Sequence, residues 1–165
     1  METYKVIEGF ENYSVSDHGN VKNNKTEKVL KQKYRRDGYM DICLVKDKNK
    51  SSHSMQRLVA KAFIPNPNAK PCVDHIDNNR HNNHIDNLRW VTKSENQHNR
   101  SINKNSTSMV KGVDFNNNKW RAQIRIDGIK IHLGLFTNIE DAKQARITRT
   151  NEAFGVFTNS CEKII

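Results

Sequence analysis

Residues 73–99 have the sequence VDHIDNNRHNNHIDNLRWVTKSENQHN. Residues 73–76 and 88–91 are short apolar-rich runs typical of strands, and the loop between them is rich in Asn, Asp, Arg and His. Thr92-Lys93-Ser94-Glu95 has the pattern of a capping box, in which the Thr92 hydroxyl accepts from a backbone amide and Glu95 reaches back. The pattern predicts strand, loop, strand and helix, with the helix beginning at about Lys93.

The same residues carry groups suited to one kind of chemistry. Hydrolysis of a phosphodiester by a metal needs a hard cation, oxygen ligands that hold it, and a base for the attacking water. Asp74 and His75 are adjacent, so a regular strand would point their side chains to opposite faces. The predicted fold can still bring Asp74 against Asn96 in the following helix. An Asp-His pair alone is more often solvated than catalytic, so the wider pattern has to carry the inference.

That wider pattern closely resembles the HNH nuclease motif with its ββα-metal fold, in the variant whose last ligand is asparagine. The matching positions are Asp74-His75, the Asn-rich loop 78–83, Asn87-Leu88, Trp90-Val91-Thr92 and Glu95-Asn96. The resemblance implies that Asp74 and Asn96 bind one divalent metal ion, Mg²⁺ or Mn²⁺. It also implies that His75 is the general base and that Asn87 fixes the loop presenting it.

Two further features of this motif yield expectations. Asn78 stands where the family usually has glycine, and asparagine tolerates a positive φ. His81, His84 and His98 match no motif position, so we expect solvated or phosphate-facing side chains there.

Residues 1–66 are predicted to form a sheet-rich module. Short strands are expected at 14–15, 20–22, 29–33 and 39–45, separated by turn signals at Asp17-His18-Gly19 and Asp37-Gly38. A helix over 56–63 is stopped by Pro65 and Pro67.

This segment resembles the NUMOD-type module of HNH homing nucleases. The resemblance is carried by Tyr13-Ser14-Val15-Ser16, Gly19-Asn20-Val21, Gly38-Tyr39 and residues 57–63, with Tyr4 and Gln56 departing from the usual Trp and His. It implies DNA contact, for which the candidates are Lys31, Lys33, Arg35 and Arg36. A solvated basic face is the alternative.

The C-terminal segment has the clearest strand pattern. Residues 119–126 alternate, with Trp120, Ala122, Ile124 and Ile126 on the packed face. Asp127-Gly128 indicates a type I′ hairpin, and the returning strand 129–133 should turn Ile129, Ile131 and Leu133 inward. A second capping box begins at Thr137 and opens a helix that ends before Gly155. We therefore expect a three-stranded sheet backed by one helix.

Residues 109–158 resemble the APETALA or ethylene-response-factor DNA-binding domain. The matching features are Lys111-Gly112-Val113, residues 119–122, Leu133-Gly134, Phe136, Glu140-Asp141-Ala142 and Phe154-Gly155. In that family the sheet lies in the major groove, which implies that the outward residues of this sheet contact DNA: Arg121, Gln123, Arg125 and Lys130. Trp120 falls on the packed face here, unlike its family counterpart.

Charge and composition fit a polyanionic partner. The 28 Lys and Arg against 18 Asp and Glu give a net charge of +10, with two basic flanks around a nearly neutral middle. Neither an amphipathic basic helix nor a long apolar run is present, which argues against a membrane partner. The N-terminus lacks an apolar signal core, and Cys43, Cys72 and Cys161 form no C-x-x-C pair, so we expect an intracellular chain with reduced cysteines.

The sequence thus predicts an α+β protein of three small modules: residues 1–66, the nuclease centre 67–104 and the sheet module 109–159, with 99–108 as a linker. The expected activity is site-directed cleavage of double-stranded DNA, leaving by resemblance a 5′-phosphate and a 3′-hydroxyl. One active site per chain predicts nicking by a monomer, without an obligate protein partner. If a phage encodes the chain, it would act in the cytoplasm of a bacterial host. The alternatives are a catalytically silent DNA-binding regulator and a structural zinc site, although the latter would favour Cys ligands.

Overall fold

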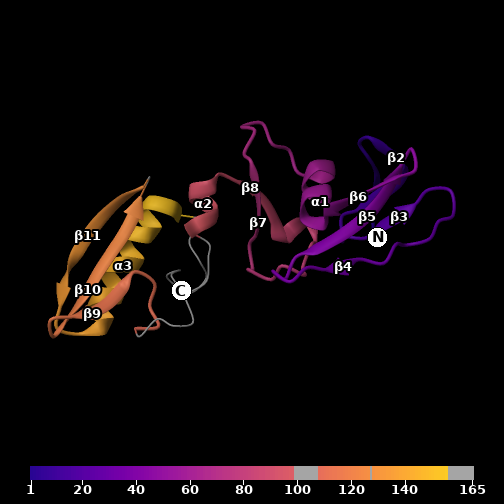
Figure 1. Cartoon of the computed structure of the whole chain (residues 1–165). Helices are drawn as coiled ribbons and strands as arrows, with labels where there is room; N and C mark the ends of the chain where they lie inside the picture. The colour runs from indigo at the N-terminus through magenta and orange to yellow at the C-terminus, as the bar shows by residue number, and fades with distance from the viewer. Residues whose placement is uncertain (99–107, 127, 156–165) are drawn as a thin grey trace. The chain divides into compact units, whose positions relative to one another are not determined.

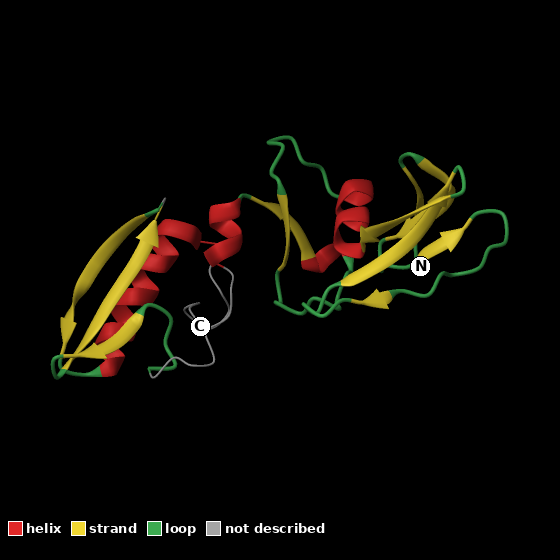
Figure 2. Ribbon diagram, in the orientation of Figure 1, coloured by secondary structure: helices red, strands yellow, loops and turns green. Residues whose placement is uncertain are grey.

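The computed structural model describes residues 1–98, 108–126 and 128–155 (Figure 1). The chain divides into two compact units, Met1–Thr92 and Lys93–Ile165. Both combine short antiparallel strands with helices (Figure 2), so the predicted α+β class is confirmed. None of the described helices has the length and apolar character needed to cross a membrane.

The first unit begins with two three-stranded antiparallel sheets. One has the order β1-β2-β3, and the other β4-β5-β6. Their strands are β1 (Tyr4–Ile7), β2 (Phe10–Ser16), β3 (Val21–Asn23), β4 (Lys33–Tyr34), β5 (Met40–Lys46) and β6 (Asn49–Ser54). The sequence pattern missed β1 and β6, since β6 (NKSSHS) is polar along its whole length and lacks alternation.

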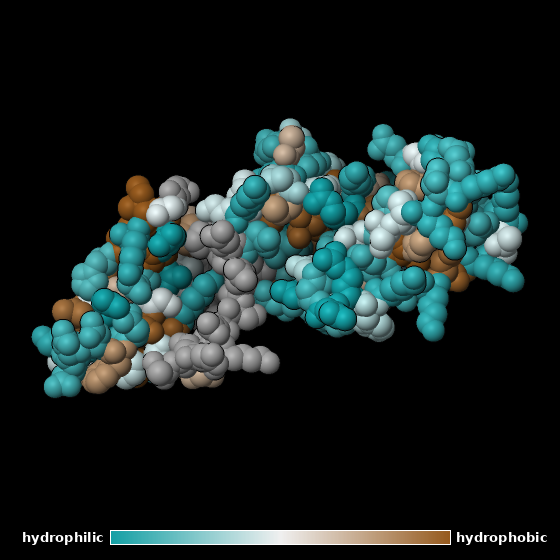
Figure 3. All heavy atoms as spheres, viewed as in Figure 1, coloured by the Kyte–Doolittle hydropathy of each residue, from teal (hydrophilic) through white to brown (hydrophobic). Residues whose placement is uncertain are grey.

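Helix α1 (Met55–Phe63) joins these sheets to the nuclease motif. Its apolar face shares one core with both the N-terminal strands and the hairpin of β7 (Cys72–His75) and β8 (Leu88–Val91). Val73 and Leu88 contribute to that core, together with Met55 and Val59. The predicted boundary after residue 66 therefore falls inside a unit that packs as one body. The visible face of this unit is mostly hydrophilic (Figure 3), as expected when the few apolar side chains are gathered in a small core.

The second unit contains α2 (Lys93–His98), which begins where the capping pattern predicts. It also contains the predicted three-stranded sheet, in the order β11-β10-β9, with α3 packed on one face (Figure 2). These elements are β9 (Val113–Asn116), β10 (Lys119–Ile126), β11 (Ile129–Phe136) and α3 (Ile139–Phe154). The small core consists of Val113, Ala122 and Ala142, with Trp120 and Phe136 packed against it.

A β-bulge lies in β11 at the end of the predicted alternation, where Leu133 packs against the small core as predicted. Ala122 pairs with Gly134 and Gln123 with His132, so Leu133 is the extra residue and side-chain alternation changes phase there. Phe136 consequently packs into the core, while Leu135 is 54% exposed. Ile129 was expected inward but is 68% exposed, because it lies at the hairpin end.

Two details of the predicted boundaries also differ. The cap of α3 is Asn138 rather than Thr137, since the Asn138 side chain accepts from the amides of Glu140 and Asp141. Ser108, placed in the linker by composition, is buried, and its hydroxyl donates to the Val113 carbonyl oxygen (2.5 Å). The rest of the predicted linker, 99–107, and Asp127 of the hairpin turn lie outside the described residues. Gly128 of that turn has a φ of +82°.

Candidate functional site

Asp74 and His75 lie at the end of β7, where the hairpin leads into the loop. Both side chains are buried, with 7% and 4% exposure. Asp74 pairs across the hairpin with Arg89 on β8, whose Nε (3.1 Å) and Nη2 (2.9 Å) donate to Asp74 Oδ2. The two bonds from one guanidinium fix the orientation of the Asp74 carboxylate at the end of β7.

The loop residue Asn83 holds the His75 ring. Asn83 Nδ2 faces the His81 carbonyl oxygen (3.4 Å), so Oδ1 is the atom that faces His75 Nε2 (3.1 Å). An amide oxygen only accepts, which makes Nε2 the protonated nitrogen and Nδ1 the basic one. Burial lowers the pKa of His75 from its ordinary 6.5, against opposing effects of Asn83, Asp74 and Asp77. The buried ring is thus favoured in its neutral, proton-accepting form.

Asn87 ties the two ends of the loop together. Its Oδ1 accepts from the Asp77 amide (3.0 Å), and its Nδ2 donates to Asp77 Oδ1 (2.9 Å) and the Asn82 carbonyl oxygen (2.7 Å). It ends the single 3₁₀ turn η1 (Ile85–Asn87) that leads into β8. Asn78 has a φ of +62°, as predicted for the position that usually carries glycine. The loop that follows His75 is therefore held together by the Asn87 side chain.

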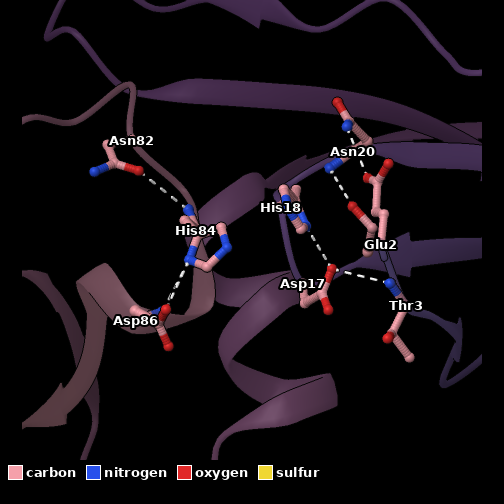
Figure 4. A network of polar contacts seen from close by, with 9 residues as sticks. Glu2, Thr3, Asp17, His18, Asn20, Asn82, His84 and Asp86 are labelled. Carbon is pink, nitrogen blue, oxygen red and sulfur yellow. Dashed lines mark hydrogen bonds and ion pairs between the residues drawn. The ribbon is translucent and has the colours of Figure 1, made fainter.

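Two turns of the N-terminal sheets also pack on this loop. A Cβ on Gly19 would lie only 2.8 Å from that of Asn83, and the Ile85 amide donates to the Asp17 carbonyl oxygen (2.8 Å). The His18 and His84 rings meet edge to face with centroids 4.6 Å apart, and each ring also contacts an aspartate, Asp17 or Asp86 (Figure 4). His84 is thus half-buried in packing rather than solvated.

The second turn, around Gly38, reaches the opposite part of the loop. Arg80 donates to the Asp37 carbonyl oxygen and lies over the Tyr39 ring, 4.7 Å from its centroid. The Tyr39 ring in turn lies 5.9 Å from the His75 ring, and Tyr34 lies 5.3 Å from His81. Sequence reasoning missed Asn83, Tyr39, Arg80 and Arg89 as parts of the site. Both glycine turns were visible in the sequence, but no local signal pairs them with the loop.

The two residues predicted to bind the metal ion belong to different units. Asp74 belongs to the first, while Asn96 is half-buried on α2 in the second. Among the described residues, no group of three or more His, Cys, Asp or Glu side chains is placed to hold a metal ion. The predicted ligand set includes an asparagine, and its carboxylate and amide oxygens are the hard donors that Mg²⁺ prefers. His98 ends α2, and its side chain lies outside the described residues.

The predicted DNA-contacting residues of the first unit are all exposed. Lys31, Lys33, Arg35 and Arg36 lie on and around β4. Arg35 is partly neutralised by Asp37 (2.7 Å) and Asp41 (3.8 Å). Cys43 and Cys72 are free thiols, as expected, and Cys161 lies outside the described residues.

On the sheet of the second unit, the predicted outward face is confirmed. Arg125 and Lys130 are exposed and lie opposite each other in the register. Arg121 and Gln123 are half-buried, because both contact Asp114 on the neighbouring strand. The Asp114 side chain raises the pKa of Arg121 above its already high value.

Comparison with known proteins gives two matching family models. The NUMOD4 motif matches residues 2–45, and the HNH endonuclease model matches residues 54–98. An uncharacterized HNH endonuclease of Acanthamoeba polyphaga mimivirus is 44% identical over 109 residues, and the DNA endonuclease I-HmuI of Bacillus phage SP01 is 40% identical over 97. These alignments cover 64% and 58% of this chain, but only 27% and 56% of the relatives' own length.

A solved structure is similar over a larger share of both chains. It is described as DNA binding and cleavage by the HNH homing endonuclease I-HmuI, with a TM-score of 0.58 and 34% identity. The match covers 79% of this chain and 76% of that one. Both the motif around His75 and the module before it are thereby accounted for, and the chain belongs to the HNH endonuclease family, with a NUMOD4 motif at its N-terminal end.

Proposed function

We propose that this protein is a metal-dependent, site-directed endonuclease that hydrolyses phosphodiester bonds in double-stranded DNA. The observation that carries the proposal is the setting of His75. Its ring is buried, favoured in the neutral form by burial and oriented by Asn83, next to a loop fixed by Asn87 and beside the buried Asp74. A neutral imidazole in a fixed orientation is the arrangement a general base requires.

In the reaction, His75 Nδ1 takes a proton from the attacking water. The water oxygen forms a bond to phosphorus, and the bond from phosphorus to the 3′ oxygen breaks. The products are a 5′-phosphate and a 3′-hydroxyl, whose oxygen takes up a proton. Asp74 and Asn96 would hold the divalent ion, Mg²⁺ or Mn²⁺, which when bound neutralises charge developing on the phosphate.

Specific binding is divided between two regions in this proposal. Lys31, Lys33, Arg35 and Arg36 contact DNA beside the cut, and the sheet β9-β10-β11 acts as an APETALA-like module that reads sequence. The division into nuclease centre and flanking DNA-binding modules, nicking by a monomer, and independence of a protein partner are parts of the same proposal. An intracellular site of action is also part of the proposal.

Conversion of supercoiled plasmid to open circles by the purified chain with Mg²⁺ tests the activity. We expect His75→Ala to lose roughly two to four orders of magnitude in rate. His132→Ala, which removes an exposed histidine of β11 far from the loop in sequence, is the matched control and should nick at the wild-type rate when the protein saturates the DNA. A wild-type chain that binds DNA but leaves the plasmid supercoiled would identify the silent regulator instead.

A further inference from the structure

The outward face of the sheet β9-β10-β11 carries one carboxylate among the residues of its three strands, that of Asp114. Its neighbours along β10 and β11 are basic or neutral, including Lys119, Arg125 and Lys130. A carboxylate facing a polyanion is repelled, so it weakens a surface that only attracts phosphates. Its presence on this face, on the edge strand β9, therefore calls for a specific role.

Asp114 lies directly opposite Arg121 in the antiparallel register. Arg121 Nε donates to Asp114 Oδ1 (3.2 Å), and Arg121 Nη2 donates to Asp114 Oδ2 (2.5 Å). Gln123 Nε2 approaches Oδ1 from the same strand as Arg121 (3.4 Å). Both carboxylate oxygens thus accept hydrogen bonds from one edge of the guanidinium. These bonds fix the plane and the direction of a side chain that otherwise has many rotamers.

The pairing leaves the other end of the guanidinium for a ligand. Of its five N–H groups, Nε–H and one Nη2–H point at Asp114, and the remaining three are on Nη1 and Nη2. One hydrogen of each terminal nitrogen forms a second fork, which matches the O6 and N7 acceptors of guanine. The side chains of Arg121 and Asp114 keep 34% and 37% of their area exposed, so the pair reaches the surface of the sheet.

We propose that Asp114 is a positioning residue that makes Arg121 a reader of guanine, and that this pair, rather than Arg125, sets sequence preference in the C-terminal module. The inference rests on the proposed function of the sheet as a DNA-binding face. Arg125 and Lys130, at the exposed hairpin end, then supply charge without base preference. The Asp114 carboxylate thus lowers the general attraction of this face to DNA and at the same time orients one base contact.

The test measures base preference with the full-length chain, in a His75→Ala background so that the DNA stays intact. Selection from random duplexes defines the preferred site, and each position of that site is then substituted in turn. We expect Asp114→Ala to lower the preference for one guanine by roughly 5- to 150-fold, the range of a bidentate base contact. Affinity for scrambled duplex should stay equal or rise, since a negative charge has been removed.

Two further variants separate positioning from a general loss of structure. Glu152→Ala on α3 also removes a carboxylate paired with an arginine, Arg149 (3.0 Å), and should leave base preference unchanged. In an Arg121→Ala background, Asp114→Ala should have no additional effect on preference, because both act on the same contact. Replacing the critical guanine by 7-deazaguanine should cost the wild type affinity but not the Arg121→Ala variant.

Some outcomes would overturn the inference. One is that Asp114→Ala weakens binding to every duplex equally, as expected from a misfolded sheet. If Arg121→Ala loses the guanine preference while Asp114→Ala retains it in full, the positioning role of Asp114 is rejected and base reading by Arg121 stands. Full preference in Arg121→Ala would reject base reading by this sheet altogether. Plasmid nicking by the chain with His75 intact is measured separately, so a failure of the proposed catalysis is distinguishable from each of these.

Discussion

Asn87 and Asp77, ten residues apart, hold each other by two hydrogen bonds of 3.0 and 2.9 Å. Asn87 uses its oxygen for the Asp77 amide and its nitrogen for the Asp77 carboxylate. Burial raises the pKa of the Asp77 carboxyl, but the hydrogen bonds from Asn82 Nδ2, the Asn79 amide and Asn87 Nδ2 together lower it below its ordinary value. A residue with one acceptor and one donor end is needed at position 87, and neither a carboxylate nor an alkyl group can replace it.

Substitution of Asn87 should therefore slow cleavage without weakening DNA binding. Asn87→Asp is nearly isosteric but sets a carboxylate against the Asp77 carboxylate and the Asn82 carbonyl oxygen. We expect it to reduce the single-turnover nicking rate at least as much as Asn87→Ala, by about 10²-fold, the typical cost of misplacing a catalytic group. Wild-type rates in Asn87→Asp would contradict the role assigned to these bonds.

The pH dependence of nicking should reflect the lowered pKa of His75. A general base must be neutral, so the rate rises with pH through the pKa of that group. Burial favours the neutral ring, which places the midpoint below the ordinary 6.5. Single-turnover rates measured across the acidic range at saturating metal would test this, and a midpoint above 6.5 would be inconsistent with a buried base.

Metal preference should follow the oxygen ligands proposed for the site. Asp74 and Asn96 supply hard donors, so Mg²⁺ and Mn²⁺ should support nicking and Zn²⁺ should support little. Removal of the ion with a chelator should stop the reaction, and added Mg²⁺ should restore it. Asn96→His introduces an imidazole and should raise the activity with Zn²⁺ relative to Mg²⁺. Strong nicking with Zn²⁺ alone in the wild type would argue against this ligand pair.

The charge at the hairpin end of the C-terminal sheet should be measurable in the salt dependence of DNA affinity. Arg125 and Lys130 lie opposite each other on β10 and β11 and are exposed. If each neutralises one phosphate, replacement by Ala should reduce the slope of log affinity against log salt by about 0.9. Lys143→Ala on α3 is the matched control, since that helix packs on the other face. Unchanged slopes in both sheet variants would remove this face from the phosphate contacts.

Local patterns predicted the elements well where a strict period was present. The alternation over Lys119–Ile126 and the capping signal before Lys93 both correspond to observed elements. The error at Ile129 has a different origin, because this residue lies at the exposed hairpin end of the sheet. The bulge at Leu133 changes the phase of β11 beyond the predicted alternation and leaves no periodic trace in the sequence. Bulges depend on the partner strand, which local pattern does not include.

The candidate site was predicted in part for a similar reason. Asp74, His75 and Asn87 follow from motif spacing, but Asn83, Tyr39 and Arg89 become visible only through contacts made by folding. Arg89 acquires its role because the hairpin register sets it opposite Asp74. Tyr39 reaches His75 from the turn before β5, far earlier in the chain. Such pairings are properties of topology, and one sequence carries no period or spacing that reports them.

The close approach of Gly19 to Asn83 has a consequence for how such proteins can be recombined. Gly19 allows no side chain there, and Asn83 is the residue that orients His75. An N-terminal module transplanted from another nuclease would have to bring a turn of the same shape, or it would displace the catalytic histidine. Exchange of the N-terminal module alone, with a junction in the proline-rich segment after α1, should therefore fail to retain cleavage.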